Sequence, residues 1–305
     1  MRSLRSRLFF SAPFFFPLKY IFSALGSAPL AMQRACSNIP GKLFRPPKCD
    51  VQSVVVEGLR AEWIHMPAAM DKSVVLYLHG GAYTMGSCNS HRRLAARVAR
   101  ACRARLLLPE YRLAPEHPYP IPLEDAVSAY RWLLECGLAP QDIAIAGDSA
   151  GGGLAMAVLV FLRDAGDPLP AATVCMSPWT DLKITGASLK TKAKADPFLK
   201  PAYLRRMAKD YIQDNDPRTP TISPIYADLQ GLPPLLIQVG SAEILQDDAV
   251  RLADRAREAG VDVTLEVWEG MVHVWQFMAH ILPEGRQAIE QIGVFVRRHT
   301  VQERC

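Results

Sequence analysis

Residues 144–153 read AIAGDSAGGG, an apolar run followed by a serine that stands between glycines. The apolar run predicts a short strand, and the residues after Ser149 predict the start of a helix. Gly147 and Gly151 lack a Cβ, so strand and helix can pack closely around a residue in an unusual backbone conformation. The stretch therefore predicts a sharp strand-to-helix turn with Ser149 exposed at its apex. Because such a pattern also arises by chance, its meaning depends on partners elsewhere in the chain.

The composition is that of a globular protein. The chain has 305 residues, of which 50% are hydrophobic and 21% charged, enough to bury one large α/β domain or two small ones. The formal net charge of +5 is mild, and the basic residues are spread along helices without interleaved aromatic residues. Nucleic acid is therefore not expected as a partner.

The cysteines and the N-terminus bear on the compartment. The seven cysteines are scattered and form no C-x-x-C pair, which favours free thiols in a reducing compartment over metal ligands or a disulfide framework. Residues 1–31 imitate a signal peptide, but Pro13, Pro17 and Lys19 interrupt the apolar run, which is too short for the roughly 20 residues of a membrane span. We interpret this segment as a covering lid in a cytoplasmic protein; a cleaved signal would instead make the protein secreted or periplasmic.

Strands and helices alternate along most of the chain. Strands are expected at 52–56, 61–65, 74–78, 106–108, 143–146, 173–176, 235–239 and 263–267. Helices are expected at 91–102, at 124–136, from the glycines after Ser149 to residue 162, at 248–259 and at 284–298. The first two strands flank a Gly58 turn and predict an antiparallel start. Continuous apolar strands alternating with amphipathic helices predict an α/β fold, a mostly parallel sheet covered by helices on both faces.

One segment interrupts this rhythm. Residues 181–220 are polar and rich in lysine and proline, with one or two short helices expected. Such an insertion after a strand is where lids and substrate pockets tend to lie. The expected organisation is an N-terminal cap segment (1–45), a first core part (46–180), a cap insertion (181–220) and a second core part (221–305).

Partners for Ser149 stand at the ends of other predicted strands. His79, Gly80 and Gly81 follow the strand 74–78, and the backbone N–H groups of the two glycines, with that of Ala150, could form an oxyanion hole. His273 follows the last strand and is the histidine best placed to act as a base. The acid that orients it is either Glu243, directly after the strand 235–239, or Asp247, which could instead cap the following helix. The position on the loop favours Glu243.

Several longer motifs resemble one known family. HGGAY, YRLAPEHPYPIPLEDA, GDSAGGG, SPWTDL, ADPFLKP and MVHVW together, in this order, are similar to the hormone-sensitive lipase family of α/β-hydrolases, in its bacterial esterase branch, over about residues 45 to 300. The resemblance implies an α/β-hydrolase fold with a helical cap and a carboxylesterase for short acyl chains. It puts the nucleophile on Ser149, the histidine on His273 and the oxyanion glycines on Gly80 and Gly81, and it is compatible with a homodimer.

Two positions depart from the family pattern. The place of the usual Asp-Pro-Leu is held here by Glu243-Ile244-Leu245, and the longer carboxylate still reaches an imidazole. The third glycine of the usual His-Gly-Gly-Gly is Ala82, which still supplies an N–H. We keep Asp247 as the alternative acid.

The sequence thus predicts a serine hydrolase that needs no metal or cofactor and acts on a small ester. Tyr83, Trp179 and Trp275 adjoin the motifs and are candidates for an apolar substrate pocket, although core packing explains such aromatic residues as well. Asp148 is expected to buttress the turn at Ser149, and residues 111–125 to serve as scaffold. The alternatives are hydrolysis of an amide, an N-acetyl or N-formyl group or a terpenoid lactone, and a binding protein on the same fold, which the retained His273 disfavours.

Overall fold

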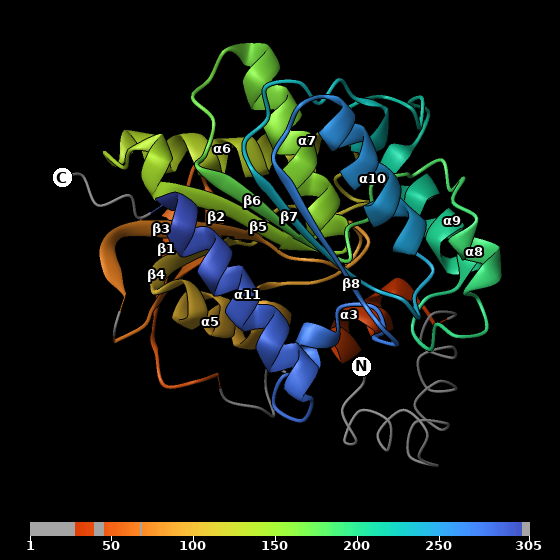
Figure 1. Ribbon diagram of the computed structural model, residues 1–305, viewed down its shortest axis with the longest axis horizontal. Helices are drawn as coiled ribbons and strands as arrows, with labels where there is room; N and C mark the ends of the chain where they lie inside the picture. The colour runs from red at the N-terminus through yellow and green to blue at the C-terminus, as the bar shows by residue number, and fades with distance from the viewer. Residues whose placement is uncertain (1–27, 40–45, 68, 301–305) are drawn as a thin grey trace.

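The computed structural model describes residues 28–39, 46–67 and 69–300 and contains one eight-stranded sheet in the order β1-β2-β4-β3-β5-β6-β7-β8 (Figure 1). The strands are β1 (Asp50–Val56), β2 (Leu59–His65), β3 (Met70–Leu78), β4 (Ala104–Pro109), β5 (Ile143–Asp148), β6 (Ala172–Met176), β7 (Leu235–Gly240) and β8 (Val263–Trp268). β1 pairs with β2, and β2 with β4, in antiparallel fashion, while the other neighbouring strands run parallel. The predicted antiparallel start and mostly parallel sheet are confirmed.

Helices cover both faces of the sheet, as predicted. α5 (Cys88–Cys102) and α11 (Pro283–Thr300) pack on one face, and α6 (Ile121–Glu135), α7 (Ala150–Ala165) and α10 (Gln246–Glu258) on the other (Figure 1). Side chains of a strand alternate between the faces. On β3, Leu76 and Leu78 join the core under α6 and α7, whereas Val75 and Tyr77 join the core under α5. Because residues 74–78 of β3 are buried on both faces, this part of the strand is a continuous apolar run.

Two helices begin three residues earlier than their apolar pattern predicts. α5 starts at Cys88 rather than at residue 91, because the Ser87 side chain accepts from the backbone N–H of Ser90 and closes a capping box. α6 starts at Ile121 rather than at residue 124, with Pro122 in its first turn. Polar caps and prolines, and not the apolar stripe, set both starts.

The insertion after β6 holds α8 (Ser188–Thr191) and α9 (Pro201–Ile212), and it lies at the same end of the molecule as α3 (Leu30–Ser37) (Figure 1). The hydroxyl of Tyr203 on α9 lies 3.4 Å from Oε1 of Gln33 on α3. Arg34 donates to the carbonyls of Thr84 and Ala114 and forms an ion pair with Glu116. The N-terminal helix is therefore fixed both to the insertion and to the loop after β3. The signal-like start, residues 1–27, and residues 40–45 lie outside the described residues.

Short 3₁₀ turns complete the structure: η1 (Pro140–Asp142), η2 (Pro224–Tyr226) and η3 (Trp275–Met278). Within the described residues, no helix combines the length and the apolar character needed to cross a membrane. The six cysteines in this part of the chain are free thiols, with Cys88, Cys102 and Cys175 buried.

Gly151→Ala should destabilise the fold. A Cβ at Gly151 would overlap the carbonyl oxygen of Leu78, whereas a Cβ at Gly152 would meet first the Pro178 side chain at 3.0 Å. Overpacking typically costs about 1–3 kcal/mol, so we expect a loss of that size from Gly151→Ala in urea denaturation and a much smaller loss from Gly152→Ala. Equal stability of the two variants would contradict this account of the turn.

Candidate active site

Ser149 lies at the turn between β5 and α7, with φ 54° and ψ −121°, a left-handed conformation that is costly for a residue with a side chain. Its side chain is only half-buried. The turn is tight enough that a Cβ at Gly147 would overlap the carbonyl of Gly151. The Ser149 N–H donates to the Met176 carbonyl at 2.8 Å, and its carbonyl accepts from the Trp179 N–H at 2.9 Å. The predicted strand-to-helix turn with Ser149 at its apex is confirmed.

Asp148 supports this turn from beneath. Its Oδ1 accepts from the hydroxyl of Tyr77 at 2.7 Å and from the Gly80 N–H at 3.1 Å, while Nε2 of His91 lies 3.4 Å from Oδ2. Burial tends to raise the pKa of Asp148, but the charge and hydrogen bond of His91 and the hydrogen bond of Tyr77 outweigh it and hold that pKa below its usual value. Asp148 therefore joins the turn at Ser149 to the end of β3.

His273 connects Ser149 to Glu243. Its Nε2 lies 2.9 Å from the Ser149 Oγ, and its Nδ1 lies 2.7 Å from Oε2 of Glu243. Because a carboxylate can only accept, Nδ1 carries the imidazole proton, and Nε2 is left to accept from the serine hydroxyl. The loops after β5, β7 and β8 thus bring together the three residues that the sequence analysis singled out.

Glu243 is fully buried and is held by groups besides His273. Its Oε1 accepts from the Ser177 hydroxyl at 2.8 Å and from the Gly240 N–H at 2.6 Å. The Ser177 Oγ also accepts from the N–H of Val274, beside His273, at 3.1 Å. One hydroxyl therefore ties the loop of the acid to the loop of the histidine.

Asp247, the alternative acid, points elsewhere. Its Oδ2 accepts from the Ser188 N–H at 2.9 Å, and its own N–H donates to the Ser188 Oγ at 3.1 Å. These contacts attach the start of α10 to the insertion. The geometry thus favours Glu243 as the partner of His273.

The surroundings of His273 raise the pKa of its imidazole. Burial lowers its pKa, but the hydrogen bond and negative charge of Glu243, together with the charges of Asp196 and Asp148, outweigh burial and raise the pKa above its usual value. His79, which is buried beside His91, shows the opposite balance: burial and that neighbour lower its pKa to about 3. His79 is therefore neutral at physiological pH, and its ring stacks on Tyr111 with centroids 4.2 Å apart.

The loop after β3 departs from the sequence prediction at Gly80. Its N–H donates to Oδ1 of Asp148 at 3.1 Å, so it is not available to a substrate oxygen. Among the described residues, the backbone N–H groups of Gly81, Ala82 and Ala150 are left without an acceptor. Ala82, the position that departs from the family's glycine pattern, therefore replaces Gly80 as a candidate oxyanion donor. Gly81 has φ +123°, and a Cβ there would overlap the Met85 carbonyl.

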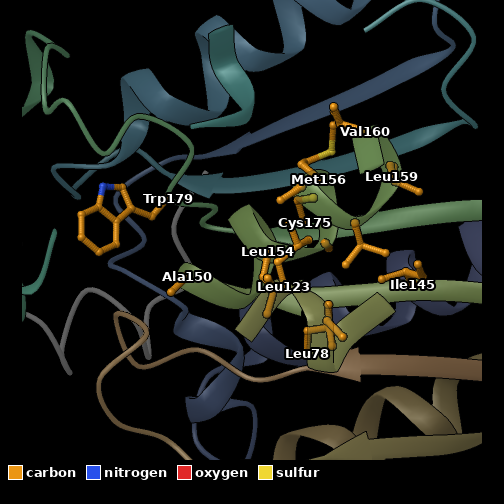
Figure 2. Close-up of a cluster of buried hydrophobic side chains, with 14 of the residues drawn as sticks. Leu78, Leu123, Ile145, Ala150, Leu154, Met156, Leu159, Val160, Cys175 and Trp179 are labelled. Carbon is orange, nitrogen blue, oxygen red and sulfur yellow. The ribbon is translucent and has the colours of Figure 1, made fainter. Parts of the chain in front are cut away.

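The three predicted pocket aromatics divide into two groups. Tyr83 and Trp179 are tilted toward each other with centroids 6.1 Å apart, and Tyr83 stacks on Tyr211 of α9 at 3.9 Å. Figure 2 shows Trp179 beyond the amino end of α7, apart from the aliphatic side chains of the core. Trp275 packs near Trp268 and among Met271, Val272 and Ala288. All three rings are buried, so their part in a substrate pocket stays a prediction.

The remaining motif residues have structural contacts, as expected. Arg112 forms a bidentate ion pair with the buried Asp125, which also accepts from the Arg112 N–H at 2.8 Å. Tyr111 donates to the His79 carbonyl at 2.6 Å. In the part of the chain that the structure describes, no group of three or more His, Cys, Asp or Glu side chains is arranged to hold a metal ion.

Three residues that support the site were not predicted from the sequence. Ser177 donates to Glu243, and Tyr77 and His91 contact Asp148 next to Ser149. Ser177 opens the SPWTDL motif and has φ 47°, but a serine at a strand end does not by itself reveal which carboxylate it meets. His91 and Tyr77 lie in a helix and a strand, where the local pattern predicts only packing. Their link to Asp148 appears once β3 and β5 are adjacent.

A parallel sheet with this turn, histidine and carboxylate at its carboxyl edge defines a hydrolase fold, and comparisons agree. The model of the alpha/beta hydrolase fold family matches residues 75–277. An acetyl-hydrolase of Streptomyces hygroscopicus is 52% identical over 260 residues, 85% of this chain and 86% of that protein. An esterase of Acinetobacter venetianus is 35% identical and covers 90% of each chain.

Solved structures give the same result at the level of the fold. A crystal structure of an esterase from the bacterial hormone-sensitive lipase family superimposes with a TM-score of 0.90 at 46% identity, covering 95% of this chain and 99% of that one. The chain belongs to the α/β-hydrolase fold family and, within it, to the hormone-sensitive lipase family of bacterial esterases.

Ser177→Ala should slow covalent labelling of Ser149 by a fluorophosphonate. The variant leaves Glu243 with one donor fewer and the Val274 N–H without its acceptor. Losing a hydrogen bond to a charged group costs about 1.5–3 kcal/mol, so we expect labelling to slow by about tenfold or more. Intact-mass spectrometry measures the rate, with Ser128→Ala on α6 as a control that should leave it unchanged. Labelling of Ser177→Ala at the wild-type rate would contradict this role.

Proposed function

We propose that the protein is a serine carboxylesterase that hydrolyses short-chain acyl esters. The observation that carries this proposal is the continuous chain of contacts from Ser149 through His273 to Glu243, with Ser149 left accessible. The names of the relatives, esterases and acetyl-hydrolases, support the same reaction class.

The reaction starts when the Ser149 Oγ attacks the ester carbonyl and Nε2 of His273 takes the hydroxyl proton. Glu243 holds the imidazole in the required tautomer and stabilises the imidazolium that forms. His273 then gives the proton to the leaving alcohol, which departs and leaves an acyl group on Ser149. A water molecule, deprotonated by His273, attacks this acyl-enzyme and releases the acid.

The negative charge that develops on the carbonyl oxygen needs donors. The N–H groups of Gly81, Ala82 and Ala150 fit this role, because they border Ser149 or follow β3 and have no other acceptor among the described residues. The Gly80 N–H contributes indirectly, since its bond to Asp148 fixes the loop.

The cap is the proposed source of substrate selection. The insertion at 181–220 and α3 form it, and Tyr83, Trp179 and Tyr211 bring closely packed aromatic rings to the junction of insertion and core. Tight packing of this kind favours small acyl groups over long chains. The predicted homodimer and cytoplasmic location stay predictions.

A second candidate is the removal of acetyl groups from amides. The relative from Streptomyces hygroscopicus is named an acetyl-hydrolase, which specifies an acetyl group and is compatible with either an ester or an amide bond. The same serine, histidine and acid can attack either bond, and the shape of the pocket decides between them.

A series of p-nitrophenyl esters from acetate to palmitate tests the proposal. We expect turnover to peak at the short chains, Ser149→Ala to abolish it, and Glu243→Ala to reduce kcat by about 10⁴-fold, the scale seen when a triad acid is removed. Asp247→Ala is the matched control and should retain most of the activity. Turnover of p-nitroacetanilide but of no ester would favour the amide reaction, and inactivation by Asp247→Ala in a folded protein would make Glu243 the wrong acid.

The pH dependence of kcat/KM should report His273. The reaction needs this imidazole neutral, and its pKa is raised above the ordinary value of about 6.5, so activity should fall on the acid side with an apparent pKa above that value. Glu243→Gln removes the charge that raises the pKa, so its acid limb should lie at lower pH and its plateau should be reduced. An unchanged acid limb in Glu243→Gln would argue against this coupling.

A further inference from the structure

The mechanism above leaves one buried carboxylate at the site without a role. Asp196 opens the DPFLKP stretch between α8 and α9 and is fully buried. Its Oδ1 accepts from the N–H groups of Phe198 and Leu199 at 2.8 and 2.9 Å, and its Oδ2 accepts from the Ile244 N–H at 2.9 Å. Ile244 is the residue directly after Glu243, so this carboxylate of the insertion contacts the loop of the triad acid.

The insertion holds the Ile244 backbone at both its polar groups. The Ile244 N–H donates to Asp196, and the Ile244 carbonyl accepts from the Ser188 hydroxyl at 2.6 Å. Rotation of this segment would break both bonds. The position of Glu243 is therefore set by the insertion as well as by the core residues Ser177 and Gly240.

Asp196 also interacts electrostatically with His273. Its charge is one of those that raise the pKa of the imidazole, beside Glu243 and Asp148. Burial and the charge of Glu243 raise the pKa of Asp196 above its usual value, while His273 and the donors from Leu199 and Ile244 act in the opposite direction. The three backbone donors favour the charged carboxylate, which would stabilise the imidazolium formed during attack.

We propose that Asp196 is a positioning residue of the active site: it fixes the backbone beside Glu243 and supplies a second negative charge that acts on His273. The effect of Asp196 on turnover rests on the proposed function, whereas its effect on the pKa of His273 does not. It also gives the insertion a direct part in organising the triad, in addition to covering the site.

The test compares neutral and charged replacements. In Asp196→Asn, NMR titration of the His273 imidazole should show a pKa lower by about half a unit or more, because an opposite charge has been removed. The acid limb of kcat/KM should move to lower pH with it, and kcat/KM at the optimum should fall by about tenfold or more through misplacement of Glu243. Asp196→Glu keeps the charge and should restore the acid limb.

The matched control is Asp247→Asn. This carboxylate binds the insertion through Ser188 close to the same loop, but it does not contact the Ile244 backbone. We expect the acid limb of this variant to stay at the wild-type pH. Asp196→Ser is a second neutral variant; serine and asparagine can both accept from the Phe198 and Leu199 N–H groups, and thermal melts identify which variant is folded.

The proposal would be overturned if Asp196→Asn or Asp196→Ser folded and left the pKa of His273 unchanged. Loss of activity alone would not support it, because replacing a residue with only a structural role could also reduce activity. The NMR titration of His273 can be measured whether or not the protein turns over a substrate. If the wild-type protein hydrolysed no ester, the proposed function would fail while the titration still decided the role of Asp196.

Discussion

The close approach of α7 to the end of β5 is the constraint on which the site depends. Ser149 is held in a left-handed conformation there, and its backbone N–H and carbonyl are both bonded to the segment that ends β6 and follows it. Glycine at 147 and 151 removes the Cβ atoms that would prevent this approach. The strain is local, but the contacts that hold it come from strands on both sides of β5.

Buried carboxylates organise the loops around this turn. Asp148 joins it to the loop after β3, Glu243 joins the loops after β6, β7 and β8, and Asp248 accepts from the N–H groups of Thr180 and Asp181 at the start of the insertion. Each of the three accepts from backbone N–H groups, which position a loop more rigidly than contacts between long side chains would. Such rigidity keeps the Ser149 hydroxyl, the His273 imidazole and the Glu243 carboxylate at the distances that proton transfer requires.

Much of this arrangement could be predicted from the sequence, and the failures have physical causes. Ser149, His273 and Glu243 follow strands of a parallel sheet, whose carboxyl ends share one edge, so their proximity follows from chain order. The direction of the Gly80 N–H does not follow from chain order, because it depends on Asp148, which approaches from another strand. Trp275 adjoins the histidine motif in sequence, and its packing near Trp268 depends on η3, which no local pattern indicates.

The spread of the triad along the chain has a consequence for folding. Ser149 and His273 are separated by 124 positions and meet only when β7 and β8 have joined the sheet beyond β6. Contacts between residues so distant in sequence form slowly, because the intervening chain must first be ordered. Recovery of catalysis during refolding would therefore be a late signal, which marks completion of the C-terminal half of the sheet and not the collapse of its first strands.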